Sequence, residues 1–330
     1  MPRPLASIRL GLPFVVALAL ATSACTAVVY RIGVPILYRK ADLPAEQIVR
    51  DLRYWDGPDA DATKNLLDLY RPKGTGWPVL VFIHGGGWTS GDKGLRVGSA
   101  DIYGNIGRYY AARGIGVAGI SYRLQPQVAW PAQLTDVARA VAWVHVNVAR
   151  YGGDPDTIIL SGHSAGSQFA ARVALDPAPL AALGVDHHVV KGLVSVSGAG
   201  LDLTDAETWR LGQPRGYYEK RFRNGDTSDG WMREASPVRF VGPDSPPGLV
   251  IYAEGDPPEL RRQGQVLYQA LRAAGVPSEI VVVPGSSHTR IILTLSRGDA
   301  TSARAIQRFV ATLAPRATIE VPPGAERAGP

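Results

Sequence analysis

The residue with the clearest chemical potential is a serine enclosed by glycines at 162–166. The segment reads Gly-His-Ser-Ala-Gly, follows aliphatic and β-branched residues at 157–160 that predict a buried strand, and precedes a predicted helix over 167–175. A G-x-S-x-G segment between a strand and a helix is typical of a nucleophilic serine at a strained turn, where glycines let other backbone pack closely. We therefore expect the Ser164 hydroxyl to stand out above a sheet edge as a nucleophile.

A second glycine-rich segment could stabilise negative charge on a substrate oxygen. Residues 79–83 predict a central strand, and His-Gly-Gly-Gly-Trp follows at once over 84–88. Consecutive glycines let backbone N–H groups approach a substrate oxygen, and the amide of Ala165, in the first turn of the predicted helix, would add another donor. Loss of one such donor typically lowers the rate by about 100- to 1000-fold. The two segments together indicate attack on a carbonyl group.

Two later strand exits carry the other groups that a nucleophilic serine requires. Residues 248–253 predict a strand that ends in Glu-Gly-Asp-Pro-Pro, so that prolines hold Asp256 in a stiff turn. Residues 279–283 predict the next strand, and we place His288 in its exit loop. Imidazole is the usual general base near neutral pH. His288 is therefore the expected base, and Asp256 the acid that orients it.

Each segment also has a simpler interpretation on its own. G-x-S-x-G occurs by chance, the glycines of 84–88 could form another kind of loop, Glu254 could take the role of Asp256, and His288 could be a surface histidine. Of the other histidines, His84 and His163 are expected to serve loop geometry, and the remaining three to be structural or solvated: His145, His187 and His188. The catalytic interpretation is favoured because four signals occur in one chain order, each at a predicted strand exit.

Several further segments, together with these, resemble a known family. They are Leu67-Asp68-Leu69-Tyr70-Arg71-Pro72, His84-Gly85-Gly86-Gly87-Trp88-Thr89-Ser90-Gly91-Asp92-Lys93, Ser121-Tyr122-Arg123-Leu124, Tyr151-Gly152-Gly153-Asp154-Pro155 and Gly162-His163-Ser164-Ala165-Gly166. Across roughly residues 50–315 the chain is similar to α/β-hydrolase esterases of the hormone-sensitive-lipase type. More narrowly, it resembles the group that holds arylformamidase-like enzymes, feruloyl-esterase-like domains and isoprenylcysteine methylesterases.

The resemblance implies a fold and a set of site residues. The fold is the α/β-hydrolase fold, the substrate a small-molecule ester, and no cofactor or metal takes part. The implied catalytic residues are Ser164, Asp256 and His288, the implied oxyanion amides are those of Gly86, Gly87 and Ala165, and Trp88 would line the acyl or alcohol pocket.

The remaining pattern predicts strands that alternate with helices. Further strands are expected at 65–70, 114–122 and 189–196, and helices at 102–113, 131–151, 260–274 and 302–314. This alternation predicts an α/β domain over 49–315 with a mostly parallel sheet covered on both faces, which binds ligands at the carboxyl ends of its strands. With one cysteine, no His-Glu-x-x-His and no G-x-G-x-x-G after a strand, the sequence indicates no metal or cofactor site.

Residues 201–245 interrupt the alternation and are expected to form a lid. The segment is rich in aromatic and basic residues: Trp209, Arg215, Tyr217, Tyr218, Lys220, Arg221, Arg223 and Trp231. One interpretation is a partly mobile lid whose aromatic residues shape the pocket and whose basic rim favours anionic substrates or membrane headgroups. The other is an ordinary solvated surface, and the sequence leaves both open.

The N-terminal residues predict export. Arg3 and Arg9 precede an apolar stretch and then small residues before Cys25, which is the pattern of a signal peptide over 1–24. The resemblance to bacterial lipoproteins implies cleavage before Cys25, its lipidation, a tether over 25–48 and a membrane-tethered protein on the periplasmic or extracytoplasmic side. An uncleaved anchor or plain secretion are the alternatives. Fatty-acid labelling that Cys25→Ala abolishes would single out lipidation.

Charge and composition limit the remaining possibilities. The formal net charge of +6 can favour an anionic membrane face, but no continuous basic helix or recognition motif indicates nucleic acid. Residues 316–330 are expected to be a disordered tail. The expected activity is hydrolysis of carboxylic esters through an acyl-enzyme. An amidase or arylformamidase would use the same residues, and a non-catalytic binding protein is the third possibility; the sequence does not give the oligomeric state.

Overall fold

The computed structural model describes residues 37–212 and 215–321 of the chain. The predicted signal peptide, Cys25 and most of the C-terminal tail lie outside the described residues, so lipidation and membrane tethering stay predictions. Within the described ranges, none of the helices combines the length and the apolar character that crossing a bilayer requires.

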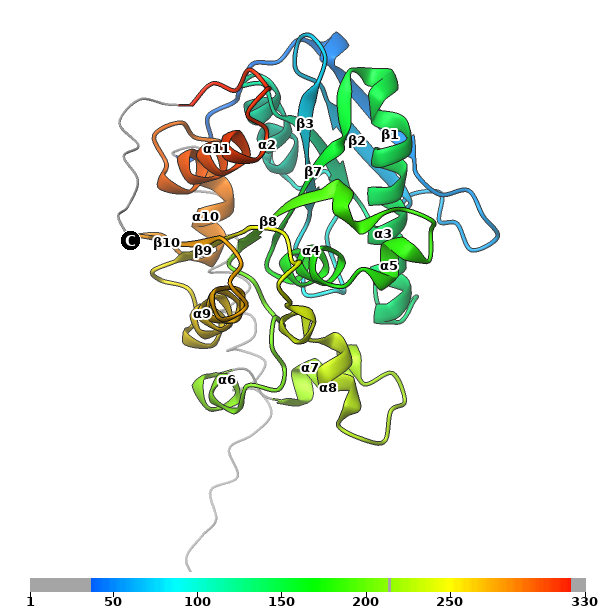
Figure 1. Cartoon of the computed structure of the whole chain (residues 1–330), viewed down its shortest axis with the longest axis vertical. Helices are drawn as coiled ribbons and strands as arrows, with labels where there is room; N and C mark the ends of the chain where they lie inside the picture. Colours follow the sequence, from blue (N-terminus) through cyan, green and yellow to red (C-terminus); the bar gives the residue numbers. More distant parts are fainter. Residues whose placement is uncertain (1–36, 213–214, 322–330) are drawn as a thin grey trace, which may run out of the picture.

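An eight-stranded sheet forms the centre of the domain (Figure 1). Its strands are β1 (Ile48–Arg53), β2 (Leu66–Tyr70), β3 (Trp77–Ile83), β6 (Gly116–Ile120), β7 (Gly153–His163), β8 (Val190–Val196), β9 (Gly248–Ala253) and β10 (Ser278–Val283). They lie in the order β1-β2-β6-β3-β7-β8-β9-β10, and β6 through β10 in that order run parallel. The predicted mostly parallel sheet is confirmed. The sequence patterns did not indicate β1, which pairs antiparallel with β2 at one edge.

Helices cover both faces of the sheet, as predicted, because alternate residues of each central strand point to opposite sides. In β3, Val79, Val81 and Ile83 join one core, and Leu80 and Phe82 join the other. The first core includes side chains of α3 (Trp130–Asn147), α4 (Ala165–Leu175) and α9 (Pro258–Ala273), and the second those of α2 (Ile102–Ala111), α10 (His288–Thr294) and α11 (Thr301–Leu313). Shorter elements are η1 (Ala45–Gln47), β4 (Arg96–Val97), β5 (Ala100–Asp101), η2 (Val148–Tyr151), α5 (Ala178–Ala181) and η3 (His187–Val189).

The lid, residues 201–245, lies between β8 and β9 in sequence. It holds α6 (Ala206–Leu211), α7 (Arg215–Phe222), α8 (Gly230–Ala235) and η4 (Pro237–Phe240), and Figure 1 shows α6, α7 and α8 together at one end of the molecule. Side chains of α9 hold its first part: Arg262 pairs with Asp205 at 2.9 Å, and Gln263 Nε2 donates to the carbonyl of Asp202 at 2.9 Å.

One local prediction was wrong. We placed His288 in the exit loop of β10, but it is the first residue of α10. Ser287 Oγ accepts a hydrogen bond from the amide of Arg290 and so caps the helix. The signal was present in the sequence, because a serine a few residues before the apolar stretch Ile291-Ile292-Leu293 is a typical N-cap of a helix.

Candidate active site

Ser164 occupies the sharp turn between β7 and α4 with φ 55° and ψ −121°, a conformation that non-glycine residues rarely adopt. The two flanking glycines make the turn possible. A Cβ at Gly162 would lie 2.2 Å from the carbonyl oxygen of Gly166, and one at Gly166 would lie 2.2 Å from the carbonyl oxygen of Ile83. Any larger residue at either position would therefore push the turn away from its neighbours.

Backbone hydrogen bonds hold the strained residue in place. The amide of Ser164 donates to the carbonyl of Val196 at 3.0 Å, and its own carbonyl accepts from the amides of Ser167 at 3.0 Å and Ala199 at 3.2 Å. Its half-buried hydroxyl makes no hydrogen bond to the residues that the structure describes. The side chain is thus anchored by the end of β8 while its oxygen stays available.

The structure brings Asp256 and His288 together, although 32 positions separate them in sequence. His288 Nδ1 lies 2.8 Å from Asp256 Oδ1. Asp256 Oδ2 accepts a hydrogen bond from Ser197 Oγ at 2.6 Å and one from the amide of Ala253 at 2.8 Å. Both carboxylate oxygens are therefore engaged, and the His288 ring is oriented so that Nε2 is the nitrogen left to exchange a proton.

The surroundings of Asp256 favour its ionised form. Burial by itself would raise the pKa of this carboxyl, but the hydrogen bonds from His288, Ser197 and the amide of Ala253 outweigh burial and lower the pKa below its ordinary value. A carboxylate that stays charged can stabilise a protonated imidazole beside it.

Glu254, the alternative acid in the same turn, points elsewhere. Its Oε2 accepts a hydrogen bond from the amide of Gly285 at 2.8 Å, at an exposed position. The carboxylate that reaches His288 is that of Asp256, which is 3% exposed.

His163 links the turn at Ser164 to His288. Its Nε2 donates to the carbonyl of His288 at 3.0 Å, and the centres of the two rings are 4.7 Å apart. Burial, and then the nearby charge of a protonated His288, lower the pKa of His163 to about 3. We expected His163 to serve loop geometry; the structure places it at the end of β7, where a neutral ring supports the backbone of His288.

The glycine loop, residues 84–88, follows β3 and lies against the turn, since a Cβ at Gly85 would be 3.2 Å from that of Ser164. Every carbonyl of the loop accepts a hydrogen bond. The carbonyl of His84 accepts from Tyr122 Oη at 3.1 Å, and that of Gly85 accepts from His84 Nδ1 at 2.7 Å. The carbonyl of Gly86 accepts from the Ser90 amide at 3.0 Å, and that of Gly87 accepts from Arg221 Nε at 2.9 Å. The carbonyl of Trp88 accepts from both the Gln125 amide at 3.0 Å and Gln133 Nε2 at 2.8 Å.

These bonds determine where the loop amides point. In a planar trans peptide group, a carbonyl and the following N–H point in opposite directions, so the bound carbonyls of Gly85 and Gly86 direct the amides of Gly86 and Gly87 to the other side. Gly86 has φ 124° and Gly87 φ 59°, which glycine adopts readily. Within the described ranges neither amide donates to another protein group. Both are free to bind a substrate oxygen.

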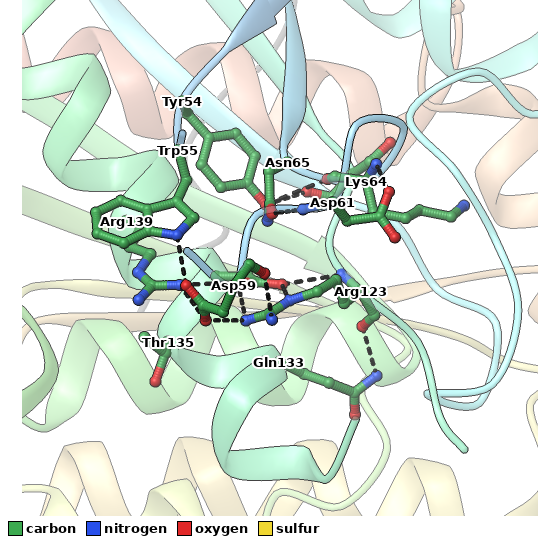
Figure 2. A network of polar contacts seen from close by, with 12 residues as sticks. Tyr54, Trp55, Asp59, Asp61, Lys64, Asn65, Arg123, Gln133, Thr135 and Arg139 are labelled. Carbon is green, nitrogen blue, oxygen red and sulfur yellow. Dashed lines mark hydrogen bonds and ion pairs between the residues drawn. The ribbon is translucent and has the colours of Figure 1, made fainter. Parts of the chain in front are cut away.

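Gln133 connects the glycine loop to a buried ion network (Figure 2). Besides Trp88, its Nε2 donates to the carbonyl of Arg123 at 2.9 Å, as Figure 2 shows. The Arg123 guanidinium in turn binds both oxygens of the fully buried Asp136, each at 2.8 Å, and lies 3.1 Å from Asp59. The support of the loop is thus itself held by charge-assisted hydrogen bonds.

Trp88 packs under the lid. Its side chain is 1% exposed, and its ring lies 4.8 Å from that of Phe222 and 5.9 Å from that of Tyr218, both on α7. Nε1 donates to Gln168 Oε1 at 3.3 Å. The lid aromatics therefore join the hydrophobic core on this face of the sheet together with Trp88, and the role of Trp88 in lining a substrate pocket stays a prediction.

The basic residues of the lid fall into two groups. Arg215 and Arg223 pair with Glu219 at 3.0 Å and 3.6 Å, whereas Lys220 is exposed and makes no ion pair within the described part of the chain. Arg221 reaches the glycine loop. A basic rim that attracts anions stays a prediction; within the described ranges, the exposed lid residues Lys220, Arg233 and Arg239 make no ion pair.

Four residues have roles at the site that the sequence did not indicate: Ser197, Gln133, Lys64, whose Nζ donates to the carbonyl of Gly91 at 2.9 Å, and Arg221, which was named only as a basic residue of the lid. They come from four different elements or loops, and no local motif marks them. Among the residues that the structure describes, no group of three or more His, Cys, Asp or Glu side chains is placed to hold a metal ion.

Comparisons with known proteins identify the family and the fold. The BD-FAE family model matches residues 67–271. Over 259 residues the chain is 32% identical to esterase LipQ of Mycobacterium tuberculosis, a match that covers 76% of this chain and 60% of the relative. Over 263 residues it is 30% identical to isoprenylcysteine alpha-carbonyl methylesterase ICME of Arabidopsis thaliana, covering 76% and 58%. The chain thus spans about three fifths of the length of these relatives.

Solved structures show the same fold at lower identity. Esterase B from Lactobacillus rhamnosis matches with a TM-score of 0.69 at 22% identity, covering 91% of this chain and 95% of that one. An esterase from Pyrobaculum calidifontis matches with a TM-score of 0.65 at 23% identity, covering 88% and 93%.

Proposed function

Since this chain belongs to the BD-FAE family and has the α/β-hydrolase fold, we propose that it is a serine hydrolase that cleaves carboxylic esters. The observation that carries the proposal is the pairing of a strained, available Ser164 with the Asp256–His288 contact of 2.8 Å, opposite two free glycine amides. A nucleophile, an oriented base and oxyanion donors are the parts that acyl transfer requires.

The reaction proceeds through an acyl-enzyme. His288 Nε2 takes the proton of Ser164 Oγ as this oxygen bonds to the ester carbonyl carbon, and the carbonyl electrons move onto oxygen. The amides of Gly86, Gly87 and Ala165 bind that oxyanion. The C–O bond to the alcohol then breaks, and the alcohol leaves with the proton from His288. Water, deprotonated by His288, repeats the addition and releases the acid.

No hydrogen bond joins Ser164 to His288 among the described residues, and the mechanism accommodates this. Hydrogen bonds of catalytic bases are often long before substrate binds and shorten in the substrate complex. His163, the residue directly before the nucleophile, already holds the backbone of His288 at 3.0 Å, which supports a Ser164–His288 contact in the substrate complex.

An amidase or arylformamidase would use the same residues on a C–N bond. Esters are the better proposal because the similar proteins carry esterase names, among them LipQ of Mycobacterium tuberculosis.

Covalent labelling tests the nucleophile. A fluorophosphonate probe should label the wild-type chain, and Ser164→Ala should abolish labelling and lower kcat on p-nitrophenyl esters by about 10⁴- to 10⁶-fold. Ser167→Ala, three residues further in α4, is the matched control, because its hydroxyl binds Ser195 Oγ at 2.7 Å instead. Labelling of Ser164→Ala at the wild-type rate would refute the assignment. The same assay with an aryl formamide and a feruloyl ester decides between ester and amide.

A further inference from the structure

Arg221 of the lid binds the glycine loop across 134 positions of sequence. Its Nε donates to the carbonyl of Gly87 at 2.9 Å, and its Nη1 donates to the carbonyl of Tyr217 at 2.8 Å. The guanidinium carbon lies 3.5 Å from the centre of the Tyr217 ring. A half-buried guanidinium with two carbonyl acceptors and an aromatic face beneath it has little freedom to move.

The other supports of the loop are of a different kind. The carbonyls of Gly85 and Gly86 are bound by His84 and Ser90, which are neighbours in sequence, and that of Trp88 is bound from the main domain by Gln125 and Gln133. Among the described residues, Arg221 is the donor to the Gly87 carbonyl, and it alone comes from the lid. The peptide group between Gly87 and Trp88 therefore depends on the lid for its orientation.

That peptide group matters because Gly87 is flexible. Its backbone has φ 59°, and glycine crosses between conformations more easily than any other residue. Gly87 is fixed only when both neighbouring peptide groups are held: the one before it by Ser90, the one after it by Arg221. The direction of the Gly87 amide is set through the Gly86 carbonyl; without the Arg221 bond, the peptide group that follows Gly87 loses its restraint, and the loop can shift and carry the Gly87 amide away from a substrate oxygen.

Tyr217 restricts the same glycine from the lid side. A Cβ at Gly87 would lie 2.9 Å from the Tyr217 hydroxyl, so α7 approaches the loop closely at this residue. Arg221 and Tyr217 thus enclose the Gly87 backbone with two side chains one helical turn apart.

We propose that Arg221 is a positioning residue for the oxyanion site: by holding the Gly87 carbonyl it makes the lid part of the catalytic apparatus. The inference rests on the proposed function, since it assumes that the Gly87 amide binds an oxyanion. It predicts that the loss of Arg221 acts on the transition state more than on substrate binding.

The test compares kcat and KM on a p-nitrophenyl ester. Arg221→Met keeps much of the side-chain volume and removes the donor, and we expect kcat to fall by about 10-fold or more while KM changes less than threefold. The rate of fluorophosphonate labelling should fall in parallel, because the labelled adduct also carries an oxygen in that site. Arg221→Lys, which keeps a donor without the planar fork, should recover part of the loss.

Arg223→Gln is the matched control. Arg223 directly follows α7 and donates to the carbonyl of Asp226 at 2.8 Å, without contact to the glycine loop. Thermal unfolding of all variants separates loss of folding from loss of rate. Unchanged kcat in Arg221→Met, a rise in KM alone, or an equal loss in Arg223→Gln would overturn the inference. Failure of the wild-type chain to react with the probe would instead refute the proposed function.

Discussion

The two halves of the candidate site are held in different ways. The half that contains Ser164, Asp256 and His288 is built from strand ends: backbone hydrogen bonds of β8 and its exit hold the nucleophile, and Ser197 and Ala253 hold the acid. The glycine loop is held by side chains that include Tyr122, Gln133 and, from the lid, Arg221. One half is thus fixed by the sheet itself, and the other depends on groups that must fold onto it.

This difference explains why the halves respond differently to substitution. A catalytic side chain at a strand end can be removed while its neighbours stay in place, so the effect is chemical. A change in the glycine loop alters the backbone that provides the donors, so geometry and folding change together. The predictions below separate these cases.

The largest effect in this group is expected for Asp256→Asn. The amide cannot stabilise a protonated His288 and favours the wrong ring tautomer, so kcat should fall by about 10⁴-fold with little loss of stability. Steady-state kinetics and thermal unfolding measure both. Glu254→Gln, in the same turn but bound to the Gly285 amide, is the control and should keep most of the activity. Comparable losses in both variants would contradict the assignment of the acid.

A smaller but still large loss is expected for Gly86→Ala. The new Cβ would lie 2.0 Å from the carbonyl oxygen of Ser90, and φ 124° disfavours a side chain, so the loop must move and its donors with it. We expect kcat to fall by about 100- to 1000-fold together with a measurable fall in the unfolding temperature. Gly216→Ala, in α7, has open space around its Cβ and should leave both nearly unchanged. Full activity in Gly86→Ala would remove the glycine loop from the site.

The smallest effect concerns stability in acid. Burial lowers the pKa of His84, in the glycine loop, to about 4, against about 6.5 in an unfolded chain. As pH falls from 6.5 towards 4 the unfolded chain binds a proton that the folded chain does not, so stability present above pH 6.5 is lost. Between pH 7.5 and 5 this amounts to about 2 kcal/mol.

Urea unfolding at several pH values measures this loss. His84→Asn should reduce the pH dependence of the free energy of unfolding by about that amount, independently of how much the substitution changes this free energy at neutral pH. The loss of stability in acid that His163 causes should remain in this variant, because the pKa of His163, about 3, is likewise below that of an unfolded histidine. Asn in place of the exposed His188 is the control. An unchanged pH dependence in His84→Asn would show that the ring is not a buried neutral group.

Sequence patterns predicted the parts of this molecule that depend on local order. The parallel sheet, most of its strands, and the placing of Ser164 and Asp256 at strand exits follow from hydrophobic runs and turn residues, whereas His288 begins a helix. The edge strand β1 was missed because its sequence, Ile-Val-Arg-Asp-Leu-Arg, has no regular alternation, and it pairs with β2 through an irregular register.

The supports of the site could not be predicted in the same way. Ser197 and Arg221 gain their roles only when chain segments 59 and 134 positions away fold against them. Neither lies in a motif, and serine and arginine are common on surfaces. Their contacts are a property of the tertiary arrangement.

The burial of Trp88 among the aromatic rings of α7 has a consequence for how such enzymes diversify. The lid and the loop share one packed cluster, so a new lid sequence must also pack around the Trp88 indole and provide the hydrogen bond to the Gly87 carbonyl. Replacing the lid by that of a relative, in order to gain the relative's substrates, should therefore alter turnover as well as selectivity. In such a chimaera, the arginine at position 221 and its aromatic partner should be restored first.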